Sequence, residues 1–302
     1  MELGMIGLGR MGASMAERLL RGGHRVVGYD PNPEAVQRLV GYGGAQADSL
    51  ESLVEQLRSP RAIWMMVPSG DPVDQTIQGL LPYLAPQDAL IDGGNSNYKD
   101  TLRRYAELKE VGFNFVDCGT SGGVWGLQEG YSLMVGGDTP VVERLRPLFE
   151  TLAPAADKGW GHVGACGTGH FTKMVHNGIE YGMMQAYAEG FAILEKKEAF
   201  ALDLHQIAEI WQHSSVVRSW LLDLTANALA ENPTMEGIAP YVTDSGEGRW
   251  TVAEAIDLDV PAPVITLSLI QRLRSRDSQA YYDRLLSAMR HQFGGHAVKH
   301  EA

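Results

Sequence analysis

The sequence has only two cysteines and no long apolar run. Cys118 and Cys166 cannot build a disulfide framework, so we expect both thiols to stay reduced, as in a cytosol. No apolar run reaches the roughly 20 residues that a membrane-spanning helix needs. Residues 1–6 include a glutamate and lack the basic segment that opens a signal peptide. We therefore expect a cytoplasmic protein.

Basic residues are also scarce. The chain has 25 lysines and arginines against 37 acidic residues, a formal net charge of −12. This balance argues against nucleic acid or an anionic membrane as a partner, because both need clustered basic side chains. A small anionic substrate stays compatible with it, since a few local arginines suffice. The nine histidines and two cysteines show no metal-ligand spacing, so we expect no metal site.

What is present predicts two domains. The chain has 302 residues and 44% hydrophobic content, enough for two cores. Strand and helix patterns alternate up to about Val163, which predicts an α/β Rossmann-type domain with a mostly parallel sheet over residues 1–164. From there the pattern is helical, which predicts an all-α domain for substrate binding and oligomerisation over residues 165–302.

A glycine-rich loop follows the first predicted strand, residues 2–6. The loop consists of Gly7, Leu8, Gly9, Arg10, Met11 and Gly12. A predicted helix over 13–20 and a second strand over 25–29 complete a βαβ unit, and Asp30 lies 18 positions after Gly12. Such glycines allow a tight turn and a close approach of the backbone to a pyrophosphate at the helix N-terminus. We predict a dinucleotide site here.

Asp30 indicates which dinucleotide binds. Its carboxylate can accept hydrogen bonds from the adenosine ribose hydroxyls but would repel a 2′-phosphate. Pro31 and Asn32 supply no cation, so NAD is favoured over NADP. Arg10 and Arg25 are the exceptions, since either could reach a 2′-phosphate; for Arg10, the alternatives are a pyrophosphate contact or a solvent-exposed position.

Further strand ends fall at the same sheet edge. The strand predicted over 62–67 ends in a Pro-Ser-Gly turn, and we include Val67, Pro68 and Asn95 in the dinucleotide site. Gly93-Gly94-Asn95 and Ser121-Gly122-Gly123 each join glycines to a small polar side chain. Either cluster alone could be a plain tight turn. Two such clusters at one edge of the sheet favour contact between their backbone and a ligand.

The helix predicted from Gly169 to about Lys196 has one polar face, formed by Lys173, His176, Asn177 and Glu180. A solvated face is the ordinary interpretation. His and Asn are poor helix formers, however, and apolar residues continue around the other sides, so we expect this helix to be buried nearly all round. A desolvated lysine can serve as a general base and a buried carboxylic acid as a proton donor, here about 10 Å apart along the axis.

Four motifs together closely resemble decarboxylating 6-phosphogluconate dehydrogenase, within the β-hydroxyacid dehydrogenase superfamily. They are the Gly7 to Gly12 loop, Ile91-Asp92-Gly93-Gly94-Asn95-Ser96, Ser121-Gly122-Gly123, and the run from Lys173 to Tyr181. The His-Asn-Gly-Ile-Glu-Tyr part of that run is specific to this family. The resemblance extends over essentially all 302 residues and is closest to the short bacterial form, which lacks the second helical bundle of the long form.

The resemblance implies a reaction of the pentose phosphate pathway with a role for each group. Lys173 would take the proton of the substrate 3-hydroxyl as hydride passes to the nicotinamide, and would then polarise the new ketone while CO2 leaves. Glu180 would protonate the enediol, which gives ribulose 5-phosphate without a metal. The substrate carboxylate and hydroxyls would be held by Asn95, Ser121, Gly122, Gly123, His176 and Asn177, and its phosphate by Tyr181 and Arg272.

Two parts of the chain bear on the phosphate and on assembly. Ser245 and Glu247 stand where the long form has a lysine and a threonine for the phosphate, so this part of the phosphate pocket departs from the family's pattern. Arg290 and His296 resemble residues that, in the family, enter a partner subunit's site. This implies a homodimer or homotetramer whose tail completes a neighbouring site; the alternative is a frayed, solvated tail.

Two other functions compete with this one. A dehydrogenase or reductase for a small β-hydroxyacid, such as 3-hydroxyisobutyrate or tartronate semialdehyde, would need Lys173 but not Glu180, Tyr181 or Arg272. A catalytically silent dinucleotide-binding protein could keep the glycine loop and lose both acid and base. Because this chain keeps all four residues, we expect NAD-linked oxidative decarboxylation of 6-phosphogluconate.

Overall fold

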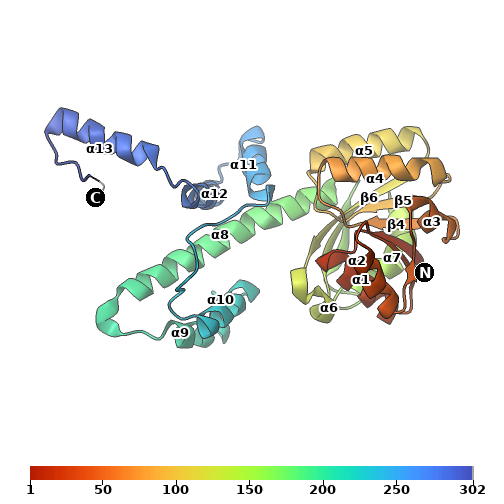
Figure 1. Cartoon of the computed structure of the whole chain (residues 1–302), viewed down its shortest axis with the longest axis horizontal. Coiled ribbons are helices and arrows are strands. Elements are labelled where there is room, and N and C mark those ends of the chain that lie inside the picture. The colour runs from red at the N-terminus through yellow and green to blue at the C-terminus, as the bar shows by residue number, and fades with distance from the viewer. Residues whose placement is uncertain (301–302) are drawn as a thin grey trace. The chain divides into compact units, whose positions relative to one another are not determined.

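The computed structural model describes residues 1–300, apart from the side chain of Val124, and divides the chain into two compact units. The first unit is Met1–Asn177 and the second begins at Gly178. Helix α8, Thr168–Lys196, contributes to both (Figure 1). The domain boundary between residues 164 and 165 stays a prediction.

The first unit contains an eight-stranded sheet in the order β3-β2-β1-β4-β5-β6-β7-β8. All neighbouring strands are parallel except β6 and β7. The strands are β1 Glu2–Ile6, β2 Arg25–Tyr29, β3 Ala45–Gln46, β4 Ala62–Met65, β5 Ala89–Asp92, β6 Asn114–Ser121, β7 Ser132–Gly136 and β8 Trp160–Gly164. This confirms the expected Rossmann-type domain with a mostly parallel sheet.

Helices cover both faces of this sheet. One core joins the sheet to α1, α2 and α7, and another joins it to α3, α4 and α5 (Figure 1). The first-unit helices are α1 Arg10–Arg21, α2 Pro33–Gly41, α3 Leu50–Glu55, α4 Asp71–Leu80, α5 Tyr98–Glu110, α6 Gly126–Glu129 and α7 Thr139–Leu152, with short 3-10 turns η1 Leu81–Tyr83 and η2 Gly123–Trp125. Side-chain caps define several starts; Asn97, for example, accepts from the amide of Lys99 at α5.

Strand β6 is longer than the sequence pattern predicts. The apolar run from Phe113 to Asp117 predicts a strand over 113–117, whereas β6 continues to Ser121. The extra residues pair with the antiparallel β7, from Cys118 opposite Val135 to Ser121 opposite Ser132. Pairing with a later strand supplies the backbone of these residues with partners that the local sequence does not reveal.

The second unit is helical, which confirms the expected class. Its further elements are η3 Glu198–Phe200, α9 Leu204–Gln212, α10 Trp220–Glu231, α11 Glu247–Asp257, α12 Pro263–Ser275 and α13 Tyr281–Gly294. A small core joins Phe191 of α8 to Ala208 of α9 and to Leu222, Ala226 and Leu229 of α10. Among the described helices, none is long and apolar enough to cross a membrane.

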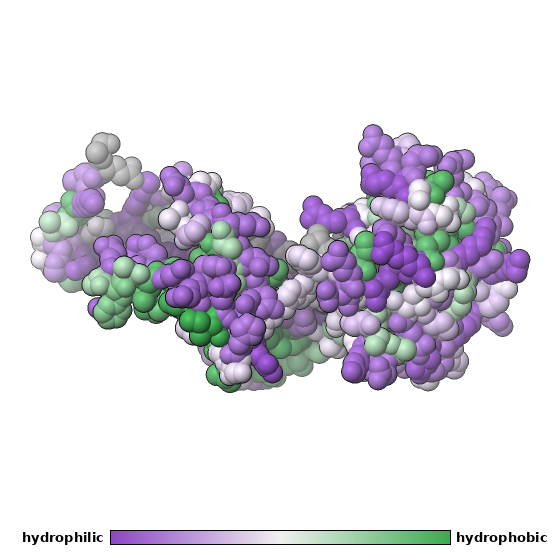
Figure 2. All heavy atoms as spheres, turned by 90° about the horizontal axis from the view of Figure 1, so that it is seen from below, coloured by the Kyte–Doolittle hydropathy of each residue, from purple (hydrophilic) through white to green (hydrophobic). Residues whose placement is uncertain are grey.

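Helix α8 is not buried all round within one chain, so that expectation was wrong. Ile179 is 51% and Ile193 is 72% exposed. Only part of its second half meets the small core with α9 and α10, and Met183 and Met184 also stay exposed in a single chain. Figure 2 shows hydrophobic residues gathered on the surface of the helical unit.

Candidate active site

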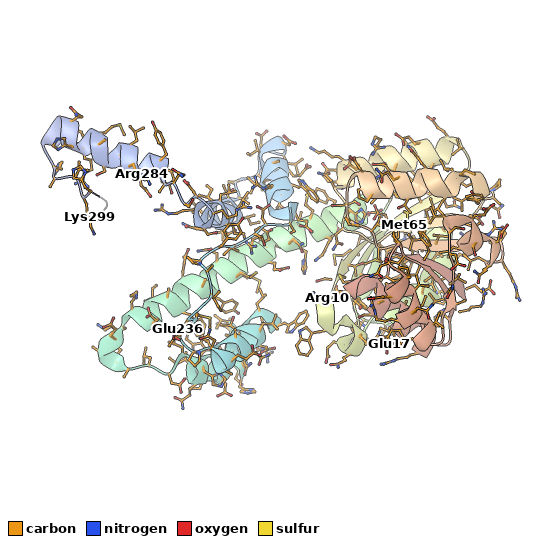
Figure 3. All side chains as sticks on the ribbon, in the orientation of Figure 1. Arg10, Glu17, Met65, Glu236, Arg284 and Lys299 are labelled. Carbon is orange, nitrogen blue, oxygen red and sulfur yellow. The ribbon has the colours of Figure 1, made fainter. Side chains whose placement is uncertain are left out.

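A cavity of about 710 Å³ lies at the carboxyl edge of the sheet in the first unit. Nine of the ten residues predicted to bind the dinucleotide line it: Gly7, Gly9, Arg10, Met11, Gly12, Asp30, Val67, Pro68 and Asn95. Figure 3 labels Arg10 at the start of α1. The tenth, Leu8, is fully buried in the core instead, and its amide donates a hydrogen bond to Asp30.

The glycine loop packs so closely that two of its positions have no room for a side chain. At Gly7 the φ angle is +86°, and an added Cβ would lie 2.5 Å from the Met66 carbonyl oxygen. At Gly12 an added Cβ would lie 2.0 Å from the Gly7 carbonyl oxygen. Helix α1 begins at Arg10 without a side-chain cap, so its first amides remain suited to an anion. These features fit a bound pyrophosphate.

Asp30 is held in place by the backbone. One carboxylate oxygen accepts from the Leu8 amide at 2.6 Å and the other from the Asn32 amide at 2.8 Å. A carboxylate has further lone pairs for ribose hydroxyls. Arg10 is the one basic residue among the described lining of the cavity.

Sequence reasoning missed several lining residues of this cavity. They are Ile6, Tyr29, Pro31, Leu50, Met66, Pro72, Gln75 and Thr76. Pro72, Gln75 and Thr76 share one face of α4, which begins just after β4 at the same sheet edge. Their i, i+3, i+4 spacing after a strand end is the signal that would have found them.

Asn95 connects two neighbouring strand ends. Its side-chain amide donates to the Thr120 carbonyl at 3.0 Å and accepts from the Thr120 amide at 2.9 Å. The residue has a φ of +53°, a conformation that asparagine tolerates better than most residues. One amide N–H and one lone pair remain for a ligand. Ser121 ends β6, followed by Gly122 and Gly123, both with positive φ.

Asp117 fixes the start of α8 to β6. This fully buried carboxylate accepts from the Gly167 amide at 2.6 Å and from the His170 amide at 2.7 Å. An anion at a helix N-terminus satisfies amides that lack partners within the helix. The first turns of α8 therefore have a defined position over the sheet edge that carries Asn95.

Lys173 lies in these first turns and is only 5% exposed. Its Nζ donates to the Asn177 side-chain oxygen at 2.6 Å and lies 3.4 Å from His176 Nδ1. His176 Nδ1 is also 2.9 Å from the same asparagine oxygen. When Nδ1 carries the ring proton, it donates to Asn177 and leaves Nε2 as an acceptor. The first unit thus brings together three of the four residues of the predicted polar face.

The second unit groups the residues predicted to hold the phosphate. The Arg272 guanidinium lies 3.5 Å from the centre of the Tyr181 ring and donates to the Thr243 carbonyl at 2.9 Å. Ser245 donates its amide to the Tyr181 hydroxyl at 3.1 Å and its hydroxyl to Glu247. Glu247 is buried. A carboxylate thus lies beside the predicted phosphate residues.

Nearby arginines are already engaged. Arg249 and Arg276 both donate to Asp244, and their hydrogen bonds hold the pKa of that carboxyl below its usual range. Glu180 lies half-buried on α8. Arg290 lies on α13 and His296 just after it, both exposed.

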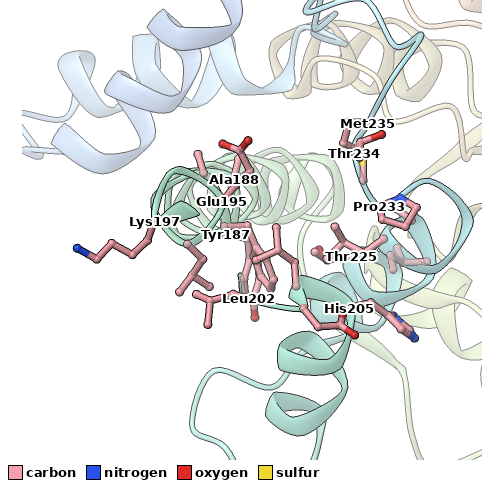
Figure 4. A pocket seen from close by; sticks show the side chains of 18 of the residues that line it. Tyr187, Ala188, Glu195, Lys197, Leu202, His205, Thr225, Pro233, Thr234 and Met235 are labelled. Carbon is pink, nitrogen blue, oxygen red and sulfur yellow. The ribbon is translucent and has the colours of Figure 1, made fainter. Parts of the chain in front are cut away.

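A larger cavity, of about 1200 Å³, lies in the second unit between α8, α9 and α10 (Figure 4). Tyr187 and Ala188 of α8, His205 of α9 and Thr225 of α10 contribute to its wall. None of the predicted site residues lines it. In the described part of the chain, no group of three or more His, Cys, Asp and Glu side chains could hold a metal ion; the absence of a metal stays a prediction.

Comparison with known proteins places these features in one family. Residues 2–167 match the family model for the NAD binding domain of 6-phosphogluconate dehydrogenase, and residues 169–284 match the model for its C-terminal domain. An NAD(+)-dependent, decarboxylating 6-phosphogluconate dehydrogenase of Haloferax volcanii is 44% identical over 299 residues, which cover 99% of this chain and 98% of the relative.

Solved structures agree with this. A Plasmodium falciparum 6-phosphogluconate dehydrogenase, studied with NADP+ and with 6-phosphogluconate, has a TM-score of 0.84 and 26% identity, covering 100% of this chain and 66% of that one. A Mycobacterium tuberculosis 3-hydroxyisobutyrate dehydrogenase has a TM-score of 0.73 at 24% identity, covering 91% and 94%, and shows a shared fold. Since two family models together span most of the sequence and a relative aligns along nearly its whole length, this chain belongs to the 6-phosphogluconate dehydrogenase family.

Proposed function

We propose that this chain catalyses the oxidative decarboxylation of 6-phospho-D-gluconate to D-ribulose 5-phosphate and CO2, with NAD as hydride acceptor. The observation that carries the proposal is the buried Lys173, hydrogen-bonded to Asn177 beside His176, on a helix anchored by Asp117. Asp117 on β6 pairs with Asp92 on β5, next to the loop that lines the dinucleotide cavity. The full-length similarity to a decarboxylating relative supports the reaction.

Lys173 would act twice on the substrate. As the neutral amine it accepts the proton of the 3-hydroxyl; NAD, when bound, accepts the hydride from C3. As the ammonium, Lys173 then donates a hydrogen bond to the new C3 carbonyl oxygen. This stabilises the electron pair that the C1–C2 bond leaves behind as CO2 departs. Asn177, which accepts a hydrogen bond from Lys173, fixes the direction of the amine.

Glu180 would complete the reaction as the general acid. It lies seven residues, about two turns, beyond Lys173 on α8. The enediol left by decarboxylation needs one proton on the carbon that lost CO2, and a protonated carboxyl group can deliver it. His176 and Asn177 would hold the substrate hydroxyls, together with Asn95 and the backbone of Ser121, Gly122 and Gly123.

Two variants separate these roles. Lys173→Met should abolish both NADH formation and CO2 release, whereas Lys158→Met, at an exposed lysine, should keep both. Glu180→Gln should chiefly slow the later protonation, so NADH and CO2 should form ahead of ribulose 5-phosphate in a single turnover. Turnover of Lys173→Met near the wild-type rate would contradict the assignment of the base.

The first assay would supply purified protein with 6-phosphogluconate and either NAD or NADP, and would trap CO2. We expect faster reduction of NAD, because Asp30 disfavours a 2′-phosphate. Faster reduction of NADP would overturn the cofactor assignment and leave the reaction intact. Reduction with 3-hydroxyisobutyrate and not with 6-phosphogluconate would overturn the substrate.

We also propose that the enzyme is a homodimer or homotetramer in which Arg290 and His296 complete a neighbouring chain's phosphate site with Tyr181 and Arg272. Helix α13 supports this: none of its residues is buried, and Phe293 is 79% exposed. Figure 3 labels Arg284 on this helix.

Mixing two inactive variants tests whether the tail of one chain completes the site of its neighbour. Lys173→Met and Arg290→Ala chains should each be nearly inactive alone. After they are unfolded and refolded together, a dimer population should recover about a quarter of the wild-type sites. No recovery, with hetero-oligomers demonstrated by mass, would show that Arg290 acts within its own chain or not at all.

A further inference from the structure

A buried carboxylate holds the loop that carries Asn95. Asp92, at the end of β5, is fully buried. One of its oxygens accepts from the Gly94 amide at 3.0 Å, and the other accepts from the Ser96 hydroxyl at 2.7 Å. At Gly93 an added Cβ would lie 2.2 Å from the Trp64 ring nitrogen, so the loop packs closely against Trp64 and has no room for a side chain there. Asp92 therefore defines the backbone on both sides of Asn95.

Asp92 in turn lies beside a buried arginine. The Arg104 side chain on α5 is 1% exposed, and its Nη1 lies 3.7 Å from an oxygen of Asp92. Its Nε and Nη2 donate hydrogen bonds to the Asp74 carboxylate of α4 at 2.9 and 2.8 Å, and Nη2 also donates to the Gly70 carbonyl at 3.0 Å. Within the described residues, Nη1 makes no hydrogen bond. The guanidinium thus connects α4 and α5 to the end of β5.

The charges support this arrangement. Burial opposes the charge on Arg104, but the hydrogen bonds to Asp74 and the charges of Asp92 and Asp74 outweigh burial and raise its pKa. Arg104 is therefore cationic at every working pH. A buried carboxylate is costly without an opposite charge nearby, and Arg104 supplies one to Asp92.

We propose that Arg104 is a positioning residue: through Asp92 it sets the loop from Gly93 to Ser96, and so the place from which Asn95 meets the substrate and the dinucleotide. The inference rests on the proposed function for its main assay. Arg104 is not itself among the residues that line the cavity; it reaches the Asn95 loop through Asp92, and its other partners, Asp74 and Gly70, lie at the start of α4. The planar guanidinium, unlike an ammonium, can hold Asp74 with two nitrogens while a third faces Asp92.

The matched pair for the test is Arg104→Lys and Arg103→Ala. Arg103 is the neighbouring residue and also binds Asp74, but its side chain is 45% exposed, and among the described residues the ion pair of Asp92 is with Arg104. Well below the melting temperature, we expect kcat/KM for 6-phosphogluconate to fall about 10- to 100-fold in Arg104→Lys and less than about twofold in Arg103→Ala. Equal values for the two variants would overturn the proposal.

A double-mutant cycle separates positioning from general destabilisation. Asn95→Gly removes the side chain and suits the positive φ. If Arg104 acts by placing Asn95, then Arg104→Lys should cost less than about twofold in the Asn95→Gly background. The same fold-loss in both backgrounds would show that Arg104 supports only the fold.

Failure of the Arg104 inference can be told apart from failure of the proposed function. If the wild-type enzyme oxidises 6-phosphogluconate, the cycle decides the role of Arg104. If it does not, the proposed function fails, and the dissociation constant of NADH, followed by its fluorescence, replaces kcat/KM in the same cycle because the loop lines the dinucleotide cavity. A weaker affinity confined to Arg104→Lys in the Asn95 background would support the inference; unchanged affinity would overturn it.

Discussion

Gly119 lies on β6 directly under the first turns of α8, and it offers the sharpest test of how Lys173 is placed. A Cβ added at Gly119 would lie 2.5 Å from the Lys173 Cβ and 2.7 Å from the Gly169 carbonyl oxygen. Carbon atoms in contact prefer about 3.5–4.0 Å. In Gly119→Ala, the helix or the strand must therefore move by about 1 Å at the root of the predicted base.

Two effects should follow from that shift. Overpacking a close contact costs about 1–3 kcal/mol, which for a unit of this size lowers Tm by about 2–4 °C per kcal/mol. Displacement of a catalytic group by about 1 Å costs about 100-fold in rate. Calorimetry would give the first quantity, and the initial rate of NADH formation at 25 °C, well below Tm, would give the second.

Gly161 on β8 is the matched control. It is also a strand glycine of the same sheet, but an added Cβ would meet nothing within 4 Å. Gly161→Ala should keep the wild-type rate and a Tm equal to or slightly above that of the wild type. A Gly119→Ala enzyme with wild-type rate and Tm would refute the close contact. A lowered Tm with an unchanged rate would refute the link between the position of α8 and catalysis.

Three further predictions concern charge and burial. Hydrogen bonding from Arg104 lowers the pKa of Asp74 to about 2. The Asp74 charge therefore stabilises the fold above the ordinary aspartate pKa, and this stability is lost as pH falls toward 2. The difference in unfolding free energy between wild type and Asp74→Asn should shrink over that interval. Burial raises the pKa of the Cys118 and Cys166 thiols, so iodoacetamide at pH 7.5 should alkylate neither in the native protein and both after denaturation, as mass spectrometry would show. Glu247→Gln should lower KM for 6-phosphogluconate severalfold, since it removes a negative charge beside the predicted phosphate residues; an unchanged KM would place the phosphate elsewhere.

The apolar surface of the second unit has a direct consequence for assembly. Val216 is 99% exposed and Ile256 is 71% exposed, and none of the described residues of α13 is buried. Soluble monomers rarely leave so much apolar area in water. The prediction from the sequence that α8 is buried nearly all round is wrong for a single chain. In the proposed oligomer, a neighbouring chain would cover the exposed apolar side chains of α8.

The sequence by itself determined the features that depend on neighbours within one motif. The strand, glycine loop, helix and second strand up to Asp30 follow from hydrophobic period and from backbone positions that only glycine can occupy, such as Gly7 with its φ of +86°. The polar face of α8 likewise follows from helical spacing alone. The helical second half was predictable for the same reason, although its helix starts were not. The sequence pattern predicts a helix from Val252, whereas α11 begins at Glu247.

Only the tertiary structure decided which distant residues meet. Asp117 binds the amides of Gly167 and His170, Asn95 exchanges two hydrogen bonds with Thr120, and Arg104 joins Asp74 to Asp92. Each contact depends on strand order and on register, and a one-residue slip turns a side chain to the other face of the sheet. The residues available for catalysis and binding can therefore be predicted from the sequence, whereas their placement depends on the packing of strands and helices that lie far apart along the chain.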